Sequence, residues 1–418
     1  MRFVKDEFYA NVLRMFTGTV GSHILWALSM LAVARLYTPE YFGEGQLFIS
    51  AASIAAVLTT GRYEMAIVIP RYQFQALSLL LFSTILSGIG AVLFFLLLLV
   101  FPEEFVRIIG VASDSPFFLP IYMLELCLYV LFYAWLVRMK KYTLVAKGTM
   151  LFPLIYLVLC VSFHFVWLPT HKLILATMLA RGGQLLYYGH FLYEDIKAQS
   201  RKISFQGIIR QGKAFADFPK FMLIGDFIDT AKSHTIPFFL TAFWGEAATG
   251  FYAMAAQVLA APAALIAKSV GDVFRQEGSR LYANYHECKA FYRKNLKLCM
   301  GYAAIICIAA YVVIPAVFPV VLGKKWELAG QYAQLMLPMT FFTLIASPLS
   351  SMYIVARKQN IYLRIQIAFL LSVIMGIGVA GWMGSNVETA LMLWGLLMII
   401  VSSISIYGGG KIARGNDG

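Results

Sequence analysis

The sequence predicts an all-α polytopic membrane protein, and three observations support this fold class. Of its 418 residues, 60% are hydrophobic and only 13% are charged, whereas soluble domains carry about 25% charged residues. The mean hydropathy is +0.75. Apolar runs recur along the whole chain, each close to the ~20 residues that a helix needs to cross a bilayer core. These runs leave no room for a soluble domain.

Twelve apolar runs are expected to form transmembrane helices. Their predicted bounds are 11–35, 42–69, 75–101, 117–138, 145–167, 172–193, 218–242, 247–270, 297–318, 330–355, 361–383 and 387–408. The N-terminal stretch is charged and has no small-residue cleavage site, so we expect no removable signal peptide.

Lysine and arginine are distributed unevenly between the two sides of the predicted membrane. Most lie in the even-numbered connections, whereas the opposite side offers only Arg35, Arg107, Lys172, Lys324 and Lys325. Because basic connections stay inside the cell during insertion, both termini are expected to be cytoplasmic. Topology and attraction to anionic lipid therefore explain the net charge of +13 without a nucleic-acid partner.

The chain is predicted to contain two lobes of six helices, residues 1–193 and 218–418. The basic amphipathic segment 194–217 links them and is expected to lie on the membrane surface. The stretches "LYTPEYFGEGQLFISAASIAAVL" and "FWGEAATGFYAMAAQVLAAPAAL" share an acidic turn, an aligned glycine (Gly43 and Gly250) and a helix rich in small residues. This similarity indicates parallel repeats. The alternative is that such glycine–aromatic turns simply recur in membrane proteins.

The seventh predicted span carries several ionisable side chains, Asp226, Asp229, Lys232 and His234. Charges inside a membrane are costly and indicate function. On a helix these residues cover an arc of about 200°, and Asp226 to His234 is ~12 Å of helix rise. The pattern predicts the wall of a hydrated cavity. The alternative is a structural network in which Asp229 and Lys232, one turn apart, neutralise each other.

The first predicted span has a milder polar face. Arg14, Gly18 and Ser22 share one side of the helix and His23 lies beside it. We expect this face to lie opposite the seventh span across the cavity. Because a free imidazole titrates near neutral pH, His23 and His234 are candidates for coupling transport to protons, the alternative being ordinary hydrogen-bonding residues.

Two further groups of charges lie inside predicted spans. Arg62, with Glu64 next to it, and Lys268 lie at similar depths near the inner ends of two spans. They are predicted to receive a diphosphate, or else to anchor the helices at the headgroups. Arg181 and Glu125 lie near the midplane of one lobe. They either pair with each other, or Arg181 contacts substrate while Glu125 accepts a proton.

The stretch "ARLYTPEYFGEGQLFISAASIAAVLTTGRYEMAIVIP" resembles the opening signature of the polysaccharide transporter family, and "SVGDVFRQEGSRLY" resembles its segment after the eighth helix. This is the family of Wzx-type O-antigen and exopolysaccharide repeat-unit flippases. It belongs to the superfamily of multidrug, oligosaccharidyl-lipid and polysaccharide exporters. The resemblance implies two six-helix lobes around a central cavity.

The resemblance also implies a function in lipopolysaccharide or exopolysaccharide synthesis. The cargo would be an undecaprenyl-diphosphate-linked oligosaccharide, moved from the cytoplasmic to the outer leaflet of a bacterial inner membrane. The implied partners are this lipid-linked oligosaccharide, membrane lipids and the polysaccharide polymerase machinery.

No motif for enzymatic chemistry is found. The stretch "GIIRQGKA" lacks the hydroxyl residue of a P-loop, and the five cysteines have no metal-ligand spacing. We therefore expect a transporter without cofactor or metal rather than an enzyme. One alternative is a proton- or sodium-coupled multidrug exporter, an antiporter that needs an acidic site for cationic cargo. The other is an integral-membrane polymerase or glycosyltransferase, which needs a large external loop.

Overall fold

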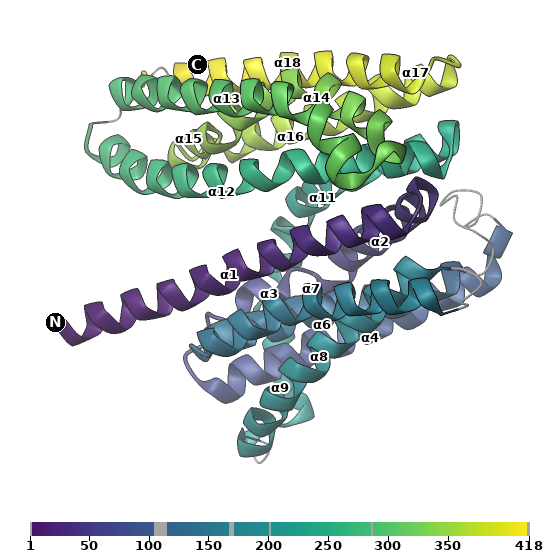
Figure 1. Ribbon diagram of the computed structural model, residues 1–418. Helices are drawn as coiled ribbons and strands as arrows, with labels where there is room; N and C mark the ends of the chain where they lie inside the picture. Colours follow the sequence, from purple (N-terminus) through teal and green to yellow (C-terminus); the bar gives the residue numbers. More distant parts are fainter. Residues whose placement is uncertain (1, 104–114, 167–170, 200–201, 286, 416–418) are drawn as a thin grey trace. The chain divides into compact units, whose positions relative to one another are not determined.

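The computed structural model describes residues 2–103, 115–166, 171–199, 202–285 and 287–415, and these are helical without any strand (Figure 1). The side chains of residues 2–16, 115, 221, 261–269, 272 and 283 lie outside this description. The predicted all-α fold is therefore confirmed.

The chain divides into two compact units, Met1–His234 and Thr235–Gly418. The boundary falls inside a helix, so the linker and the larger part of the seventh predicted span, residues 218–234, belong to unit 1. The helices of unit 1 are α1 (Arg2–Leu36), α2 (Pro39–Thr60), α3 (Tyr63–Ala66), α4 (Gln73–Val100), α6 (Leu119–Arg138), α7 (Tyr142–Phe165), α8 (Lys172–Gln199), α9 (Phe205–Ala214), α10 (Asp217–Phe221) and the start of α11 (Leu223–Trp244).

Unit 2 begins within α11 and contains the remaining helices. These are α12 (Glu246–Tyr285), α13 (Lys289–Val317), α14 (Glu327–Leu349), α15 (Ser351–Val355), α16 (Gln359–Val373), α17 (Val379–Trp382) and α18 (Val387–Ile412). Short π-helical segments, Phe318–Leu322 and Ile374–Gly378, extend α13 and join α16 to α17. α14 packs against α12, α13 and α18, so it lies at the core of this unit.

Nine helices in the described part of the chain are long and apolar enough to cross a membrane. The other predicted spans correspond to α8, α11 and α12, which have 28, 22 and 40 residues and contain the polar side chains discussed below. The protein is thus a multi-pass membrane protein, and the count of twelve spans stays a prediction.

Two helix boundaries differ from the prediction. The second span, expected over 42–69, is broken because Gly61 and Arg62 adopt the left-handed conformation, with φ of 57° and 60°. A left-handed residue ends a helix. The eighth span continues to Tyr285, well beyond the predicted end at residue 270. The stretch "SVGDVFRQEGSRLY" is therefore the last part of α12.

The linker forms the short helix α9, which packs on α4. Ser204 caps its first turn by accepting a hydrogen bond from the Gly207 amide at 3.1 Å. Gly212 lies so close to Phe82 that a Cβ there would be 2.5 Å from the ring. The hydroxyl of Tyr63, the first residue of α3, donates to the Gly212 carbonyl at 3.1 Å. The linker is thus attached to the segment that contains Arg62.

Candidate functional site

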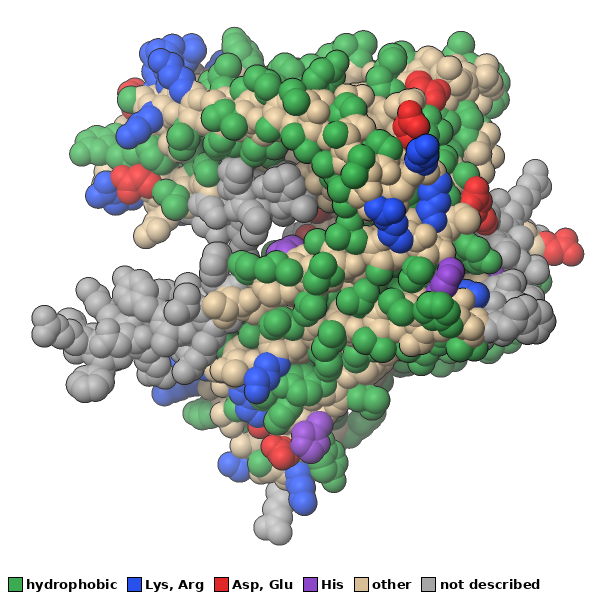
Figure 2. Space-filling model, in the orientation of Figure 1, with side chains coloured by type: hydrophobic (Ala, Val, Ile, Leu, Met, Phe, Trp, Pro, Cys, Tyr) green, Lys and Arg blue, Asp and Glu red, His purple; other side chains and the backbone are tan. Residues whose placement is uncertain are grey.

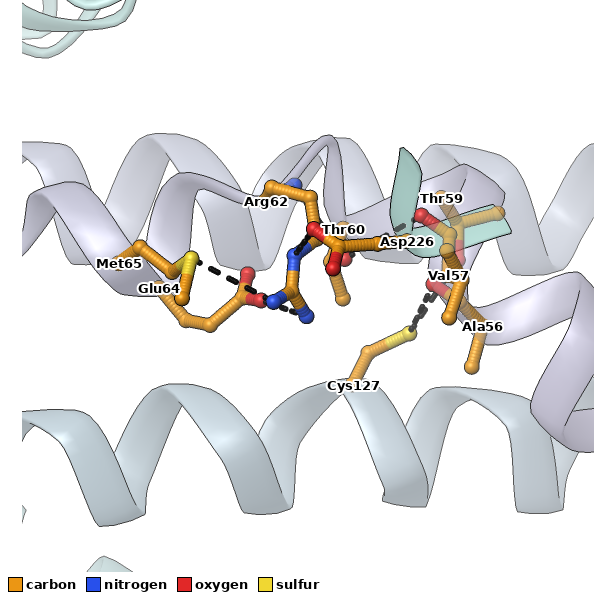
Figure 3. A network of polar contacts seen from close by, with 9 residues as sticks. All are labelled: Ala56, Val57, Thr59, Thr60, Arg62, Glu64, Met65, Cys127 and Asp226. Carbon is orange, nitrogen blue, oxygen red and sulfur yellow. Dashed lines mark hydrogen bonds and ion pairs between the residues drawn. The ribbon is translucent and has the colours of Figure 1, made fainter. Parts of the chain in front are cut away.

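An arginine and two carboxylates form a charged cluster in unit 1. Arg62 Nη1 lies 2.9 Å from Glu64 Oε1, and Arg62 Nε lies 2.6 Å from Asp226 Oδ2. Figure 3 shows the guanidinium between the two carboxylates, with Asp226 contributed by α11. We call Arg62, Glu64 and Asp226 the carboxylate triad.

The charges of the triad do not balance, because two carboxylates share one guanidinium. The Glu64 side chain is 10% exposed, and its Oε2 atom has no hydrogen-bond partner among the described residues. Asp226 is more open, at 34% exposure. The triad carries one excess negative charge until a proton or another cation joins it. In a poorly solvated position such an excess is costly, and this favours cation uptake.

The backbone around the triad is held by its neighbours. Arg62 has a positive φ of 60°, which is uncommon for a residue other than glycine. Arg138 of α6 donates to the carbonyls of Ile67 and Pro70, at 3.0 and 2.5 Å, just after α3. These contacts hold the segment after α3, next to the turn from which Arg62 contacts Glu64 and Asp226.

The four ionisable residues of α11 have different kinds of partner: Asp226 and His234 contact other segments of unit 1, whereas Asp229 and Lys232 contact each other. Asp226 contacts Arg62, and His234 Nδ1 lies 3.1 Å from Ser50 Oγ of α2. Lys232 Nζ lies 2.6 Å from Asp229 Oδ1 on the same helix, and the Asp229 side chain is 58% exposed. The Asp229–Lys232 contact is the structural alternative raised from the sequence. The cavity-wall role of this face stays a prediction.

Arg181 of α8 has a different environment from Arg62. Its guanidinium carbon lies 4.4 Å from the ring centroid of Tyr129 and 4.1 Å from that of Phe152. Its Nη1 donates to Gln184 Oε1 at 2.5 Å, and Gln184 in turn donates to the Gly148 carbonyl at 2.7 Å. No described carboxylate lies within 4.0 Å of it, so the ion pair expected with Glu125 is not formed. The reason is geometric: two aromatic rings and an amide surround the guanidinium.

Glu125 of α6 borders a mainly apolar cavity of about 1250 Å³ within unit 1. Its Oε2 atom is buried without a hydrogen-bond partner among the described residues. Gly182 and Gly183 of α8 also line the cavity, and a Cβ on Gly182 would lie 3.4 Å from Glu125 Oε1. The paired glycines therefore leave space beside this carboxylate.

A buried pair that sequence reasoning missed joins Glu44 of α2 to His171, which precedes α8. Glu44 Oε1 and His171 Nδ1 are in hydrogen-bond contact, and the residues are 7% and 6% exposed. The available signal was a glutamate between two glycines, Gly43 and Gly45, at the start of an apolar helix. An acidic residue in that position indicates a buried partner.

The prediction that the Gly18–Ser22 side of α1 faces a cavity is wrong. A Cβ on Gly18 would lie 2.4 Å from Ala146 Cβ, and Ser22 Oγ donates to the Thr149 carbonyl at 2.9 Å. This side of α1 packs on α7 because glycine lets the two backbones approach closely. His23 is exposed.

Two predicted site side chains, those of Arg14 and Lys268, lie outside the described residues. Within the described part of the chain, no group of three or more potential metal ligands occurs.

Solved structures show which class of protein has this fold. A structure described as "Lipid II flippase MurJ, inward closed conformation" matches with a TM-score of 0.71 and 13% identity, covering 96% of this chain and 89% of that one. An inward-facing multidrug resistance MATE family transporter of the MOP superfamily matches with a TM-score of 0.65 and 16% identity, covering 92% and 93%. An outward-facing MATE transporter gives 0.55 and 15%, covering 95% and 92%. The fold is that of these polytopic membrane transporters.

The sequence comparison gives the family. A family model described as "Polysaccharide biosynthesis protein" matches residues 32–331, and the chain belongs to this family. A comparison with curated protein sequences gives no match.

Proposed function

We propose that this protein is a flippase that moves undecaprenyl-diphosphate-linked oligosaccharide repeat units across a bacterial inner membrane. The observation that carries the proposal is the combination of family and fold: a polysaccharide biosynthesis protein over residues 32–331 with the fold of a lipid II flippase. Polysaccharide assembly needs its lipid-linked units moved to the outer leaflet, and an alternating-access transporter supplies this step without enzymatic chemistry. Its termini lie in the cytoplasm.

Within this proposal Arg181 is the contact for the anionic diphosphate. It is a half-buried arginine with no carboxylate within 4.0 Å among the described residues. Stacking on Tyr129 and Phe152 fixes the plane of its guanidinium. A planar guanidinium matches two phosphate oxygens at once. Lys232, Lys268 and Arg14 are the other basic residues proposed to bind the cargo.

The carboxylate triad is the proposed ion-coupling site. Arg62 forms ion pairs with both Glu64 and Asp226, so its proposed role is to position these carboxylates rather than to bind a phosphate. Because the carboxylate triad has an excess negative charge, it binds a proton or metal cation in one state of the transport cycle and releases it in the other. Asp229, Glu125, His23 and His234 are the remaining candidates for this coupling.

The test is transport by purified protein in proteoliposomes with a fluorescent polyprenyl-diphosphate sugar. Arg181→Ala and Lys232→Ala should remain inserted but slow outward delivery at least tenfold, whereas Lys172→Ala, at the start of α8, should transport normally. Glu64→Gln should bind the cargo with unchanged affinity but lose acceleration by an ion gradient. Normal flipping by both Arg181→Ala and Lys232→Ala would remove the assigned substrate path.

The second candidate function, multidrug export, is favoured by one observation. The cavity beside Glu125 has mainly apolar walls, and Glu125 Oε2 has no hydrogen-bond partner among the described residues, which suits a lipophilic cation. Transport of a cationic dye without any delivery of the polyprenyl-diphosphate sugar would establish this alternative over the flippase.

A further inference from the structure

A groove in unit 2 combines a basic mouth with apolar walls. α13 and α18 flank α14, and the groove lined by these three helices has a volume of about 430 Å³. This is within the range of small-ligand sites, ~300–1,000 Å³. All of its lining residues belong to unit 2, and none lies in the candidate site of unit 1.

Four cations surround the mouth of this groove. α13 contributes Lys289 and Arg293, one turn apart; Lys411 lies at the end of α18, and Arg414 lies just after it. None of the four forms an ion pair within 4.0 Å among the residues that the structure describes. Figure 2 shows a group of Lys and Arg side chains at the end of this unit where α13 begins and α18 ends.

The wall beyond the cations is apolar. Leu296 and Met300 continue the same face of α13, and Phe341 and Ile345 of α14 form the floor. Met300 is 46% exposed and Tyr407, on the α18 side, is 74% exposed. The groove is therefore continuous with the exposed apolar surface that a membrane helix presents to lipid.

The helix ends that carry the cations are fixed to each other. The hydroxyl of Tyr292 donates to the Ile406 carbonyl at 2.7 Å, and the Cys288 amide donates to the Ala413 carbonyl at 2.9 Å. These two contacts keep the basic residues of α13 and α18 on opposite sides of one opening. The mouth is thus held open before a ligand arrives, which lowers the entropy that binding must overcome.

We propose that this groove binds a membrane phospholipid with an anionic headgroup from the cytoplasmic leaflet. The four cations hold the phosphate, and one acyl chain lies along the apolar wall. Basic pockets between transmembrane helices on the cytoplasmic side recognise anionic lipid headgroups in this way. The predicted orientation places the start of α13 and the end of α18 on that side. The proposal is independent of the transported cargo.

The experiment measures phosphatidylglycerol binding to the full chain in detergent by native mass spectrometry. Lys289→Gln/Arg293→Gln removes two cations of the mouth. Lys294→Gln/Lys297→Gln is the matched control, because it removes the same charge from the same helix at positions outside the groove. The groove variant should bind about 30-fold more weakly, the effect of two surface cations on a phosphate, and the control should bind as the unaltered protein does.

Further binding measurements, with another lipid, a variant of the apolar wall and inorganic phosphate, identify the class of ligand. Phosphatidylcholine should bind more weakly than phosphatidylglycerol, and Met300→Trp, which narrows the apolar wall without changing charge, should also lose phosphatidylglycerol. Equal losses in the groove variant and its control would show a diffuse charge effect and overturn the proposal. Inorganic phosphate binding as tightly as the lipid would overturn the assignment to a lipid.

Discussion

Removing Arg62 should destabilise unit 1 more than removing the whole carboxylate triad. Arg62→Ala leaves Glu64, 10% exposed, and Asp226, 34% exposed, as neighbouring carboxylates without their cation. Breaking one side of a buried ion pair costs about 3–5 kcal/mol because a charge is left uncompensated. Asp226 is partly solvated, so Glu64 dominates and we expect a loss near the lower end, about 3 kcal/mol. Replacing both acids as well should recover most of this loss.

The assay is denaturant unfolding in mixed micelles, comparing Arg62→Ala with the triple variant Arg62→Ala/Glu64→Gln/Asp226→Asn. We expect the triple variant to be more stable than the single variant by at least 1 kcal/mol, since neutral amides do not repel each other. A single variant as stable as the unaltered protein would show that the ion pairs contribute nothing. A triple variant less stable than the single one would show that the carboxylates are stabilising without the arginine, and either result refutes the reasoning.

Three further predictions concern other parts of the fold. Glu44→Ala should lower stability by about 1–3 kcal/mol, measured by unfolding, because it leaves the buried His171 Nδ1 without its hydrogen-bond partner; a neutral result would show that the contact is dispensable. Burial raises the pKa of the Cys288 thiol to about 11, so at pH 8 the thiolate is about 0.1% of the total and maleimide labelling should be slow, rising as pH approaches 11; rapid labelling at pH 7 would contradict this. Gly18→Ala should cost about 1–3 kcal/mol by overpacking against α7, whereas the control Gly88→Ala, which has open space around it, should be neutral or stabilising in the same unfolding assay.

The helices were predictable from the sequence because each depends on local hydropathy over about 20 residues. Breaks such as the one at Gly61 and Arg62 were not, since a positive φ is uncommon for arginine and the apolar run continues beyond it. The sequence also does not predict which buried polar residues contact each other. Glu44 and His171 are separated by 127 positions, and a single sequence contains no information on which distant helices meet.

The same limit explains why Arg62 and Arg181 look alike in the sequence but differ in the structure. Each is an arginine inside an apolar run, and hydropathy treats them equally. Arg62 has two carboxylates on it, whereas Arg181 has two aromatic rings and an amide. The first environment pairs the positive charge with two carboxylates, whereas the second has no described carboxylate within 4.0 Å of the guanidinium.

This contrast predicts opposite responses to lysine. At Arg181 a lysine keeps the charge but loses the planar stack on both rings and the bidentate geometry toward a diphosphate. Arg181→Lys should therefore bind the polyprenyl-diphosphate sugar about tenfold more weakly, close to Arg181→Ala. At Arg62 the charge is what matters, so Arg62→Lys should retain most of the stability lost in Arg62→Ala. Full cargo affinity in Arg181→Lys would mean that charge alone acts at Arg181, and the argument from its stacked geometry would fail.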